Sequence, residues 1–124
     1  MSVPAQTEHT KGWIRLFHGT DLASASDIIA NGLNVQKASQ FNGSGEFWAT
    51  TDREYADVFA QANPAGGTPA RLEFEVPQSV LSALMNAKPP ELFQDGRDSY
   101  EFTPASIPTL NPFVMTGRVV TPVP

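Results

Sequence analysis

The chain has 124 residues, of which 40% are hydrophobic, with eight Phe and two Trp, and this is typical of one globular domain with one modest core. It has no cysteine, which excludes disulfides, thiolate zinc sites and a thiol nucleophile, and with only His9 and His18 we expect no metal site. The formal net charge of −5 disfavours a nucleic-acid partner, because proteins that bind the phosphate backbone usually present a basic face.

The N-terminal residues 1–11 are polar and lack the charged and then apolar pattern of a secretion signal. No run approaches the ~18 apolar residues of a membrane span. We therefore expect a flexible arm over 1–11 and a single domain over 12–124, with no membrane partner. The expected location is the cytoplasm, or delivery from it by a route that needs no signal peptide.

The first strong pattern is a short apolar strand over 13–17 that runs into a polar His-Gly-Thr corner at 18–20. A helix is expected next, because apolar residues recur at helical spacing. Thr20 or Asp21 is a suitable N-cap, and the Asn-Gly pair at 31–32 is a typical helix stop.

The middle of the chain repeats this order of strand and helix. A polar loop is expected over 34–44, followed by an aromatic strand over 46–50. Thr51 and Glu54 have the spacing of a capping box, which predicts that a second helix begins there. The Pro- and Gly-rich stretch 63–67 ends this helix.

Alternating residues over 71–76 predict a half-buried strand. Its apolar side chains share one face, and Glu73 and Glu75 are expected on a solvated face. The last third predicts a helix over 80–85, loops at 88–90 and 94–99, a strand from 100–102, a turn at 104–108 and one or two strands within 113–120. Eleven prolines favour short elements and an α+β fold over regular βαβ repeats.

These motifs, in this order, resemble the ADP-ribosyltransferase superfamily. The shared features are the His-Gly-Thr after a strand, the Gly-x-Gly turn into Phe-Trp-Ala-Thr at 47–50, the helix after it, and Tyr-Glu-Phe at 100–102. The chain is most similar, over 16–110, to the His-Tyr-Glu group that includes diphtheria toxin and the poly(ADP-ribose) polymerases. The resemblance implies a small α+β fold in which two antiparallel sheets form an NAD cleft flanked by short helices.

The resemblance also implies roles for individual residues. His18 would hydrogen-bond a ribose hydroxyl of NAD⁺, the Gly19 backbone would pair with the nicotinamide amide, and Thr20 would support the corner. Phe47 falls at the position of the aromatic residue that stacks on the nicotinamide. Glu101 matches the catalytic glutamate that stabilises positive charge on the ribose.

Other residues complete the implied site or depart from the family pattern. Tyr55 or Phe59 is the candidate for the second aromatic wall, and Arg97 and Asp98 are candidates for acceptor recognition. Phe47 stands where the group has tyrosine, so the ring is kept and the hydroxyl lost. Ser99 replaces the acidic or amide residue that arginine-modifying relatives carry two positions before the glutamate, which disfavours arginine as acceptor.

The sequence thus predicts a mono-ADP-ribosyltransferase-like enzyme of toxin or effector type, with NAD⁺ as co-substrate and no metal. Its expected partners are a macromolecular acceptor, a protein rather than a nucleic acid, and a cognate inhibitor protein. One alternative is an inactive relative that binds NAD⁺, ADP-ribose or a protein partner. The other is an RNA 2′-phosphotransferase relative, which ranks last because the chain holds only eight Lys and Arg residues.

Overall fold

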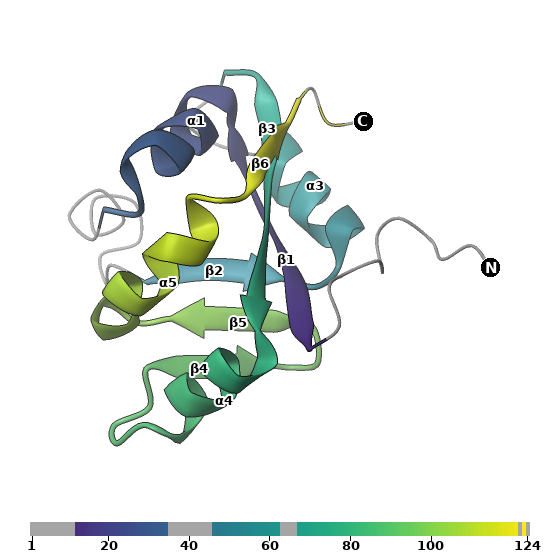
Figure 1. Cartoon of the computed structure of the whole chain (residues 1–124). Coiled ribbons are helices and arrows are strands. Elements are labelled where there is room, and N and C mark those ends of the chain that lie inside the picture. Colours follow the sequence, from purple (N-terminus) through teal and green to yellow (C-terminus); the bar gives the residue numbers. More distant parts are fainter. Residues whose placement is uncertain (1–11, 35–45, 63–66, 122, 124) are drawn as a thin grey trace.

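The computed structural model describes residues 12–34, 46–62, 67–121 and 123. The expected arm over 1–11 and nearly all of the expected loop over 34–44 lie outside these residues. The described chain is α+β, as the sequence predicts (Figure 1). Its elements, in order, are β1 (Trp13–Asp21), α1 (Leu22–Asn31), β2 (Phe47–Thr50), α3 (Arg53–Gln61), β3 (Pro69–Pro77), α4 (Gln78–Asn86), β4 (Leu92–Asp95), β5 (Ser99–Phe102), a 3₁₀ turn (Pro104–Ser106), α5 (Ile107–Val114) and β6 (Arg118–Val120).

The strands form one antiparallel sheet in the order β4-β5-β2-β1-β3-β6, where the resemblance implies two sheets. The join between β1 and β2 is a single residue pair, Phe17 with Thr50, whereas β1 and β3 are paired along their full length. Figure 1 shows β4, β5 and β2 running across the direction of β1 and β3. The sheet therefore consists of two three-stranded halves. We call the place where 18–21 of β1 diverges from 47–49 of β2 the strand split.

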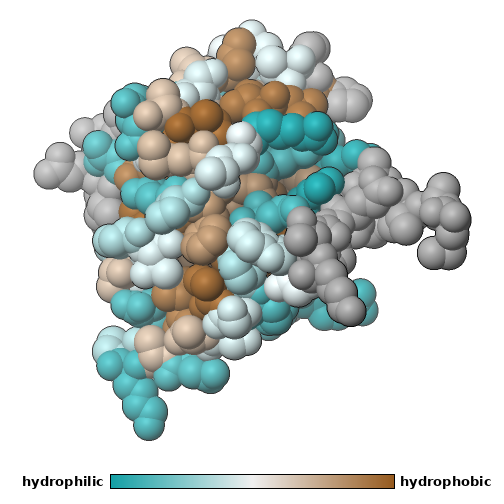
Figure 2. All heavy atoms as spheres, in the orientation of Figure 1, coloured by the Kyte–Doolittle hydropathy of each residue, from teal (hydrophilic) through white to brown (hydrophobic). Residues whose placement is uncertain are grey.

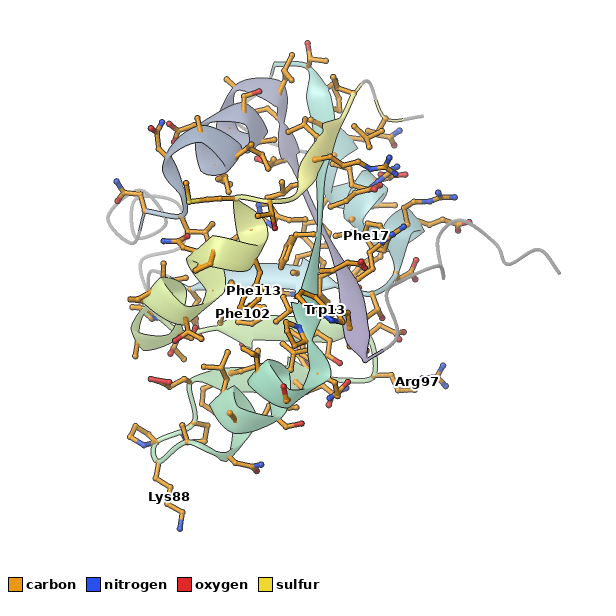
Figure 3. The ribbon with its side chains drawn as sticks, viewed as in Figure 1. Trp13, Phe17, Lys88, Arg97, Phe102 and Phe113 are labelled. Carbon is orange, nitrogen blue, oxygen red and sulfur yellow. The ribbon has the colours of Figure 1, made fainter. Side chains whose placement is uncertain are left out.

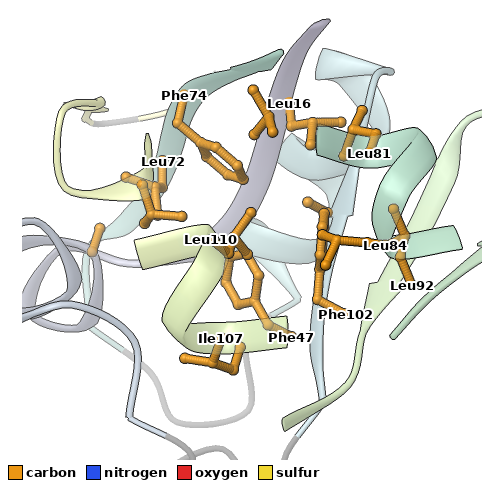
Figure 4. Packing of buried hydrophobic residues seen from close by; sticks show 14 of the residues in the cluster. Leu16, Phe47, Leu72, Phe74, Leu81, Leu84, Leu92, Phe102, Ile107 and Leu110 are labelled. Carbon is orange, nitrogen blue, oxygen red and sulfur yellow. The ribbon is translucent and has the colours of Figure 1, made fainter. Parts of the chain in front are cut away.

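The hydrophobic core lies between one face of this sheet and helices α1, α4 and α5 (Figure 4). Both halves of the sheet contribute to it. Its largest members are Leu16, Phe47, Leu72, Phe74, Leu81, Leu84, Leu92, Phe102, Ile107 and Leu110. Helix α3 lies on the other face of the sheet, against Gly19 of β1.

Strand β1 is longer than expected, because it runs through the His-Gly-Thr segment and ends at Asp21. Pairing with β3 continues to Asp21, so the expected corner at 18–20 is extended strand. Asp21 caps α1 by accepting a hydrogen bond from the Ser24 N–H at 2.8 Å. The expected helix stop is confirmed, because Gly32 has a φ of 82°. In α3 the N-cap is Asp52, which accepts from the Tyr55 N–H, and not Thr51.

Three segments in the last third differ from the predictions. The expected loop over 94–99 is part of a hairpin, in which β4 and β5 are joined by a turn at 96–98. The expected turn over 104–108 and strand at 113–115 form the 3₁₀ turn and α5. Pro108 lies in the first helical turn, where an N–H has no helical partner, so it does not prevent the helix.

The expected solvated face of β3 is also wrong for Glu73, which is only 5% exposed. Helix α3 covers this face, and Glu73 accepts hydrogen bonds from Arg71 and Arg118. The remaining expected elements are confirmed, at 46–50, 71–76, 80–85, 100–102 and the last part of 113–120. None of the helices in the described ranges is long and apolar enough to span a membrane.

Candidate site at the strand split

His18 lies on β1 at the edge of the strand split. Its Nδ1 donates a hydrogen bond of 2.7 Å to the Trp48 carbonyl oxygen of β2. Its ring packs on Phe47, with 4.5 Å between the two ring centroids. Burial lowers the pKa of His18, although the hydrogen bond to Trp48 acts in the opposite direction. The ring is therefore neutral at pH 7, and with Nδ1 protonated its Nε2 carries a lone pair that accepts a hydrogen bond.

Gly19 is a glycine for a structural reason that the sequence does not reveal. A Cβ at this position would overlap the Ala56 carbonyl oxygen of α3 and would lie 2.8 Å from the Ala60 nitrogen. One edge of β1 pairs with β3 here, Gly19 with Arg71. Within the described residues, the opposite edge has no strand partner beyond Phe17. Gly19 and the half-buried Thr20 therefore lie on an open strand edge.

Phe47 and Trp48 point to opposite faces of β2. Phe47 is 6% exposed and packs in the core between His18, Phe74 and Phe102. Its ring thus has no free face on which a ligand can stack, contrary to the role that the resemblance implies. Trp48 faces α3 instead. The alternation of a strand shows that one of the two rings must face away from the core, but not which one.

Trp48 packs with Tyr55 and Phe59 into what we call the aromatic cluster. The ring centroids are 4.8 Å apart for Trp48 and Phe59, 5.4 Å for Trp48 and Tyr55, and 5.2 Å for Tyr55 and Phe59. Tyr55 and Phe59 are 44% and 46% exposed. The cluster therefore offers aromatic surface to a ligand, on the face of the sheet opposite the core.

Glu101 lies on β5, in register with Trp48 of β2 on one side and Phe93 of β4 on the other. Residues paired in this way present their side chains on the same face of the sheet. Phe93, which sequence reasoning missed, is 46% exposed. Glu101 is thus the middle member of a row of three side chains, with an aromatic residue on each side.

His18 and Glu101 are both neighbours of Trp48, although they are far apart in the chain. With β2 between β1 and β5, and with β1 diverging from β2 at His18, their backbones are separated by at least two strand spacings, or ~10 Å. His18 points toward the core face with Phe47, whereas Glu101 shares the face of Trp48. The two side chains therefore approach the strand split from opposite faces of the sheet.

Arg97 and Asp98 lie in the exposed turn between β4 and β5. The Asp98 carbonyl oxygen accepts a hydrogen bond of 2.8 Å from the Thr51 N–H, and this bond holds the turn beside the start of α3. Figure 3 shows Arg97 projecting away from the body of the protein. Both residues are thus on the same side of the fold as α3, and neither contributes to the strand split itself.

A cavity of about 380 Å³ opens elsewhere, near the start of β1. It is lined by Trp13, Arg15, Glu73, Phe74, Glu75, Thr116, Gly117 and Arg118. None of the residues that sequence reasoning assigned to the site lines it. On the face that carries α5 and β6, hydrophilic and apolar side chains are mixed (Figure 2).

Comparison with protein-family models, with curated proteins and with solved structures gives no match. The described residues hold no group of three or more His, Asp and Glu side chains placed to bind a metal ion.

Proposed function

We propose that this protein is a mono-ADP-ribosyltransferase-like enzyme that cleaves NAD⁺ between nicotinamide and ribose. It then passes ADP-ribose to a protein acceptor or to water. The observation that carries the proposal is that Glu101 and the partly exposed aromatic cluster share the face of Trp48, next to the place where β1 and β2 diverge. In this proposal the two three-stranded halves correspond to the two sheets that the resemblance implies, and NAD⁺ binds at the strand split.

The open edge of β1 supports the binding half of this proposal. An unpaired strand edge presents backbone N–H and C=O groups that can pair with the carboxamide of nicotinamide, as they would with another strand. The neutral His18 ring supplies an acceptor at Nε2 for a ribose hydroxyl. Trp48, with Phe59 and Tyr55, supplies the aromatic surface for the nicotinamide ring that Phe47 cannot offer.

The chemical half of the proposal rests on Glu101. When the bond between the ribose C1′ and the nicotinamide nitrogen breaks, the electron pair leaves with nicotinamide and positive charge develops on the ribose. A carboxylate that faces this charge stabilises the oxocarbenium-like transition state, and such a group contributes about 10²–10³-fold to the rate. The acceptor nucleophile then forms the new bond at C1′.

Release of nicotinamide from NAD⁺ by the purified full chain tests this function, with transfer of labelled ADP-ribose to lysate proteins as the second readout. We expect Glu101→Gln to abolish both signals. Glu91→Gln is the matched control, because it removes a carboxylate that precedes β4 and lies outside the row with Trp48. Absence of both signals in the unmodified chain, or full activity of Glu101→Gln, overturns the proposal.

The second candidate is a relative that binds NAD⁺ or ADP-ribose without cleaving it. The approach of His18 and Glu101 from opposite faces of the sheet favours it, because a catalytic pair usually faces one ligand from one side. Calorimetric binding of NAD⁺ with no release of nicotinamide selects this candidate. A cognate inhibitor protein and the identity of the acceptor stay predictions of the resemblance.

A further inference from the structure

Helix α3 lies across the strand split on the face opposite the core. Its buried residues Ala56 and Ala60 rest on Gly19 of β1, so closely that no side chain fits between helix and strand. Its two flanks contact different halves of the sheet. Each flank makes contacts of a different chemical kind.

One flank of α3 contacts β2, in the half formed by β4, β5 and β2. This contact consists of Tyr55 and Phe59 against the indole ring of Trp48. Both rings on the helix remain almost half exposed, so burial alone does not hold them in place. Their position therefore depends also on the other contacts of α3, which include its N-cap at Asp52 and the packing of Ala56 and Ala60 on Gly19.

The other flank contacts β3 through an ion pair. The Arg71 guanidinium donates from one terminal nitrogen to Asp57 Oδ1 of α3, at 2.6 Å. The side chains of Arg71 and Asp57 are 8% and 16% exposed, so solvent screens this pair much less than a surface pair.

Arg71 also forms an ion pair with Glu73 of the same strand. Its Nε donates to Glu73 Oε2 at 2.7 Å, while Arg118 Nε of β6 donates to Glu73 Oε1 at 2.8 Å. The planar guanidinium thus binds Glu73 of the sheet through Nε and Asp57 of the helix through a terminal nitrogen. Lysine cannot reproduce this geometry. The orientation of Arg71 toward Asp57 is fixed by the strands.

We propose that the Asp57–Arg71 ion pair is the positioning contact that holds α3 across the strand split, and thereby fixes Tyr55 and Phe59 against Trp48. Because a single residue pair joins β1 to β2, strand pairing alone does not set the spacing of the two halves at the split. The helix adds a restraint on the face opposite the core to the one that the His18–Trp48 hydrogen bond supplies. In this proposal Asp57 and Arg71 act through the position of the aromatic rings and not through contact with NAD⁺.

The consequence for catalysis rests on the proposed function, whereas the restraint on the rings does not. If the aromatic cluster binds the nicotinamide ring, loosening α3 weakens NAD⁺ binding without removing the group that stabilises the transition state. Loss of Asp57 then raises KM for NAD⁺ and leaves kcat nearly unchanged. Loss of Glu101 has the opposite pattern.

Trp48 itself reports on the restraint. The chain has two Trp residues, so Trp13→Phe leaves Trp48 as the single indole fluorophore. In this background Asp57→Asn keeps the size of the side chain and removes its charge, and Glu54→Gln on the same helix is the matched control. We expect Asp57→Asn and Arg71→Lys to shift Trp48 emission to longer wavelength and to raise its acrylamide quenching constant at least twofold. Glu54→Gln leaves both unchanged.

Unchanged emission and quenching in folded Asp57→Asn overturn the proposal. If Asp57→Asn does not fold, the double variant Asp57→Asn with Arg71→Gln replaces it, because no charge of the pair is then left unpaired, and the same two readouts decide. For NAD⁺, we expect KM to rise about tenfold in Asp57→Asn with kcat within threefold, and Asp57→Glu to recover most of the loss. Failure of the unmodified chain to bind or cleave NAD⁺ counts against the proposed function alone, because the fluorescence of Trp48 still decides on the restraint.

Discussion

His18 and Trp48 are joined across the strand split by a hydrogen bond of 2.7 Å between the imidazole Nδ1 and the backbone carbonyl oxygen. It connects β1 and β2 just beyond their single residue pair. A side-chain hydrogen bond thus connects the two strands at the point where their backbone pairing ends. The same bond fixes the tautomer of His18, which makes this residue the simplest place to test the geometry of the split.

The first prediction concerns the pH dependence of stability. Burial lowers the pKa of His18 below its ordinary value of 6.5, so on acidification the unfolded chain takes up the proton before the folded one. The free energy of unfolding is therefore highest above pH 6.5 and falls as the pH drops below it. Urea unfolding at pH 7.5 and 5.5 measures this slope. We expect it to be smaller in His18→Gln, and equal slopes in the two proteins would contradict the effect of burial on the pKa of His18.

The second prediction concerns the contact of α3 with β1. Gly19→Ala places a methyl group against the Ala56 carbonyl oxygen, and the helix must move to admit it. We expect a loss of about 1–3 kcal/mol in the free energy of unfolding, as for other overpacked sites. Denaturant titration measures it, with the exposed Ala23→Ser as control. A stability equal to that of the unmodified chain would show that α3 does not rest on Gly19.

The third prediction contrasts a buried and an exposed member of the ion cluster formed by Asp57, Arg71, Glu73 and Arg118. Burial by itself would raise the pKa of Glu73, but hydrogen bonds from Arg71 and Arg118 hold it below its ordinary value. The stabilisation it provides is present above pH 4.5 and is lost as the pH falls through the lower pKa of the folded state. Glu73→Gln removes the charge of one of the two carboxylates that Arg71 contacts, while Asp57 remains, and we expect a loss of about 1–3 kcal/mol at pH 7.

Arg118→Ala is the contrast to Glu73→Gln, because the Arg118 side chain is 72% exposed. We expect it to cost less than about 1 kcal/mol. Thermal and urea unfolding of both variants at pH 7 and pH 4 provide the comparison. A larger loss for Arg118→Ala than for Glu73→Gln would mean that the buried part of the cluster contributes little.

The fourth prediction separates the two aromatic residues of β2. Phe47→Ala opens a cavity in the core, and we expect a loss of about 3–5 kcal/mol in stability. Trp48→Ala removes a ring from the partly exposed cluster and, on the proposed function, weakens NAD⁺ binding by ~1–3 kcal/mol, the worth of one stacking contact. Calorimetry with NAD⁺ and urea unfolding of both variants measure the two effects. If Phe47→Ala weakens binding while its stability is retained, the assignment of the two rings is reversed.

Local chemistry suffices to predict much of this fold. The helix over Leu22–Asn31 follows from a capping side chain, helical spacing and a glycine, and β3 follows from strict alternation. Both signals lie within a few neighbouring residues. The same reasoning fails for α5, where the prolines suggest a turn and the β-branched residues suggest a strand. Its helical spacing of buried Ile107, Leu110 and Val114 is set by contact with the core.

The site is less accessible to sequence reasoning than the fold. The motifs select His18 and Glu101, and the structure places both beside Trp48. They do not show that Phe47 is the buried ring, because alternation is symmetric until one face of the strand is known. The alternation over 71–76 also predicts a solvated Glu73. The burial of Glu73 depends on α3 and on Arg118, and both are distant from it along the chain.

The path of the chain through the two halves of the sheet has a consequence for folding kinetics. Each of the four described α-helices follows a strand of one half and precedes a strand of the other, so the chain crosses between the halves four times. Of the five strand pairs in the described residues, β4–β5 alone is a tight hairpin, and the other four join strands that are separated by at least one helix. Most of the sheet is therefore assembled from segments that are distant along the chain, and such a dominance of non-local contacts is typical of slow folding.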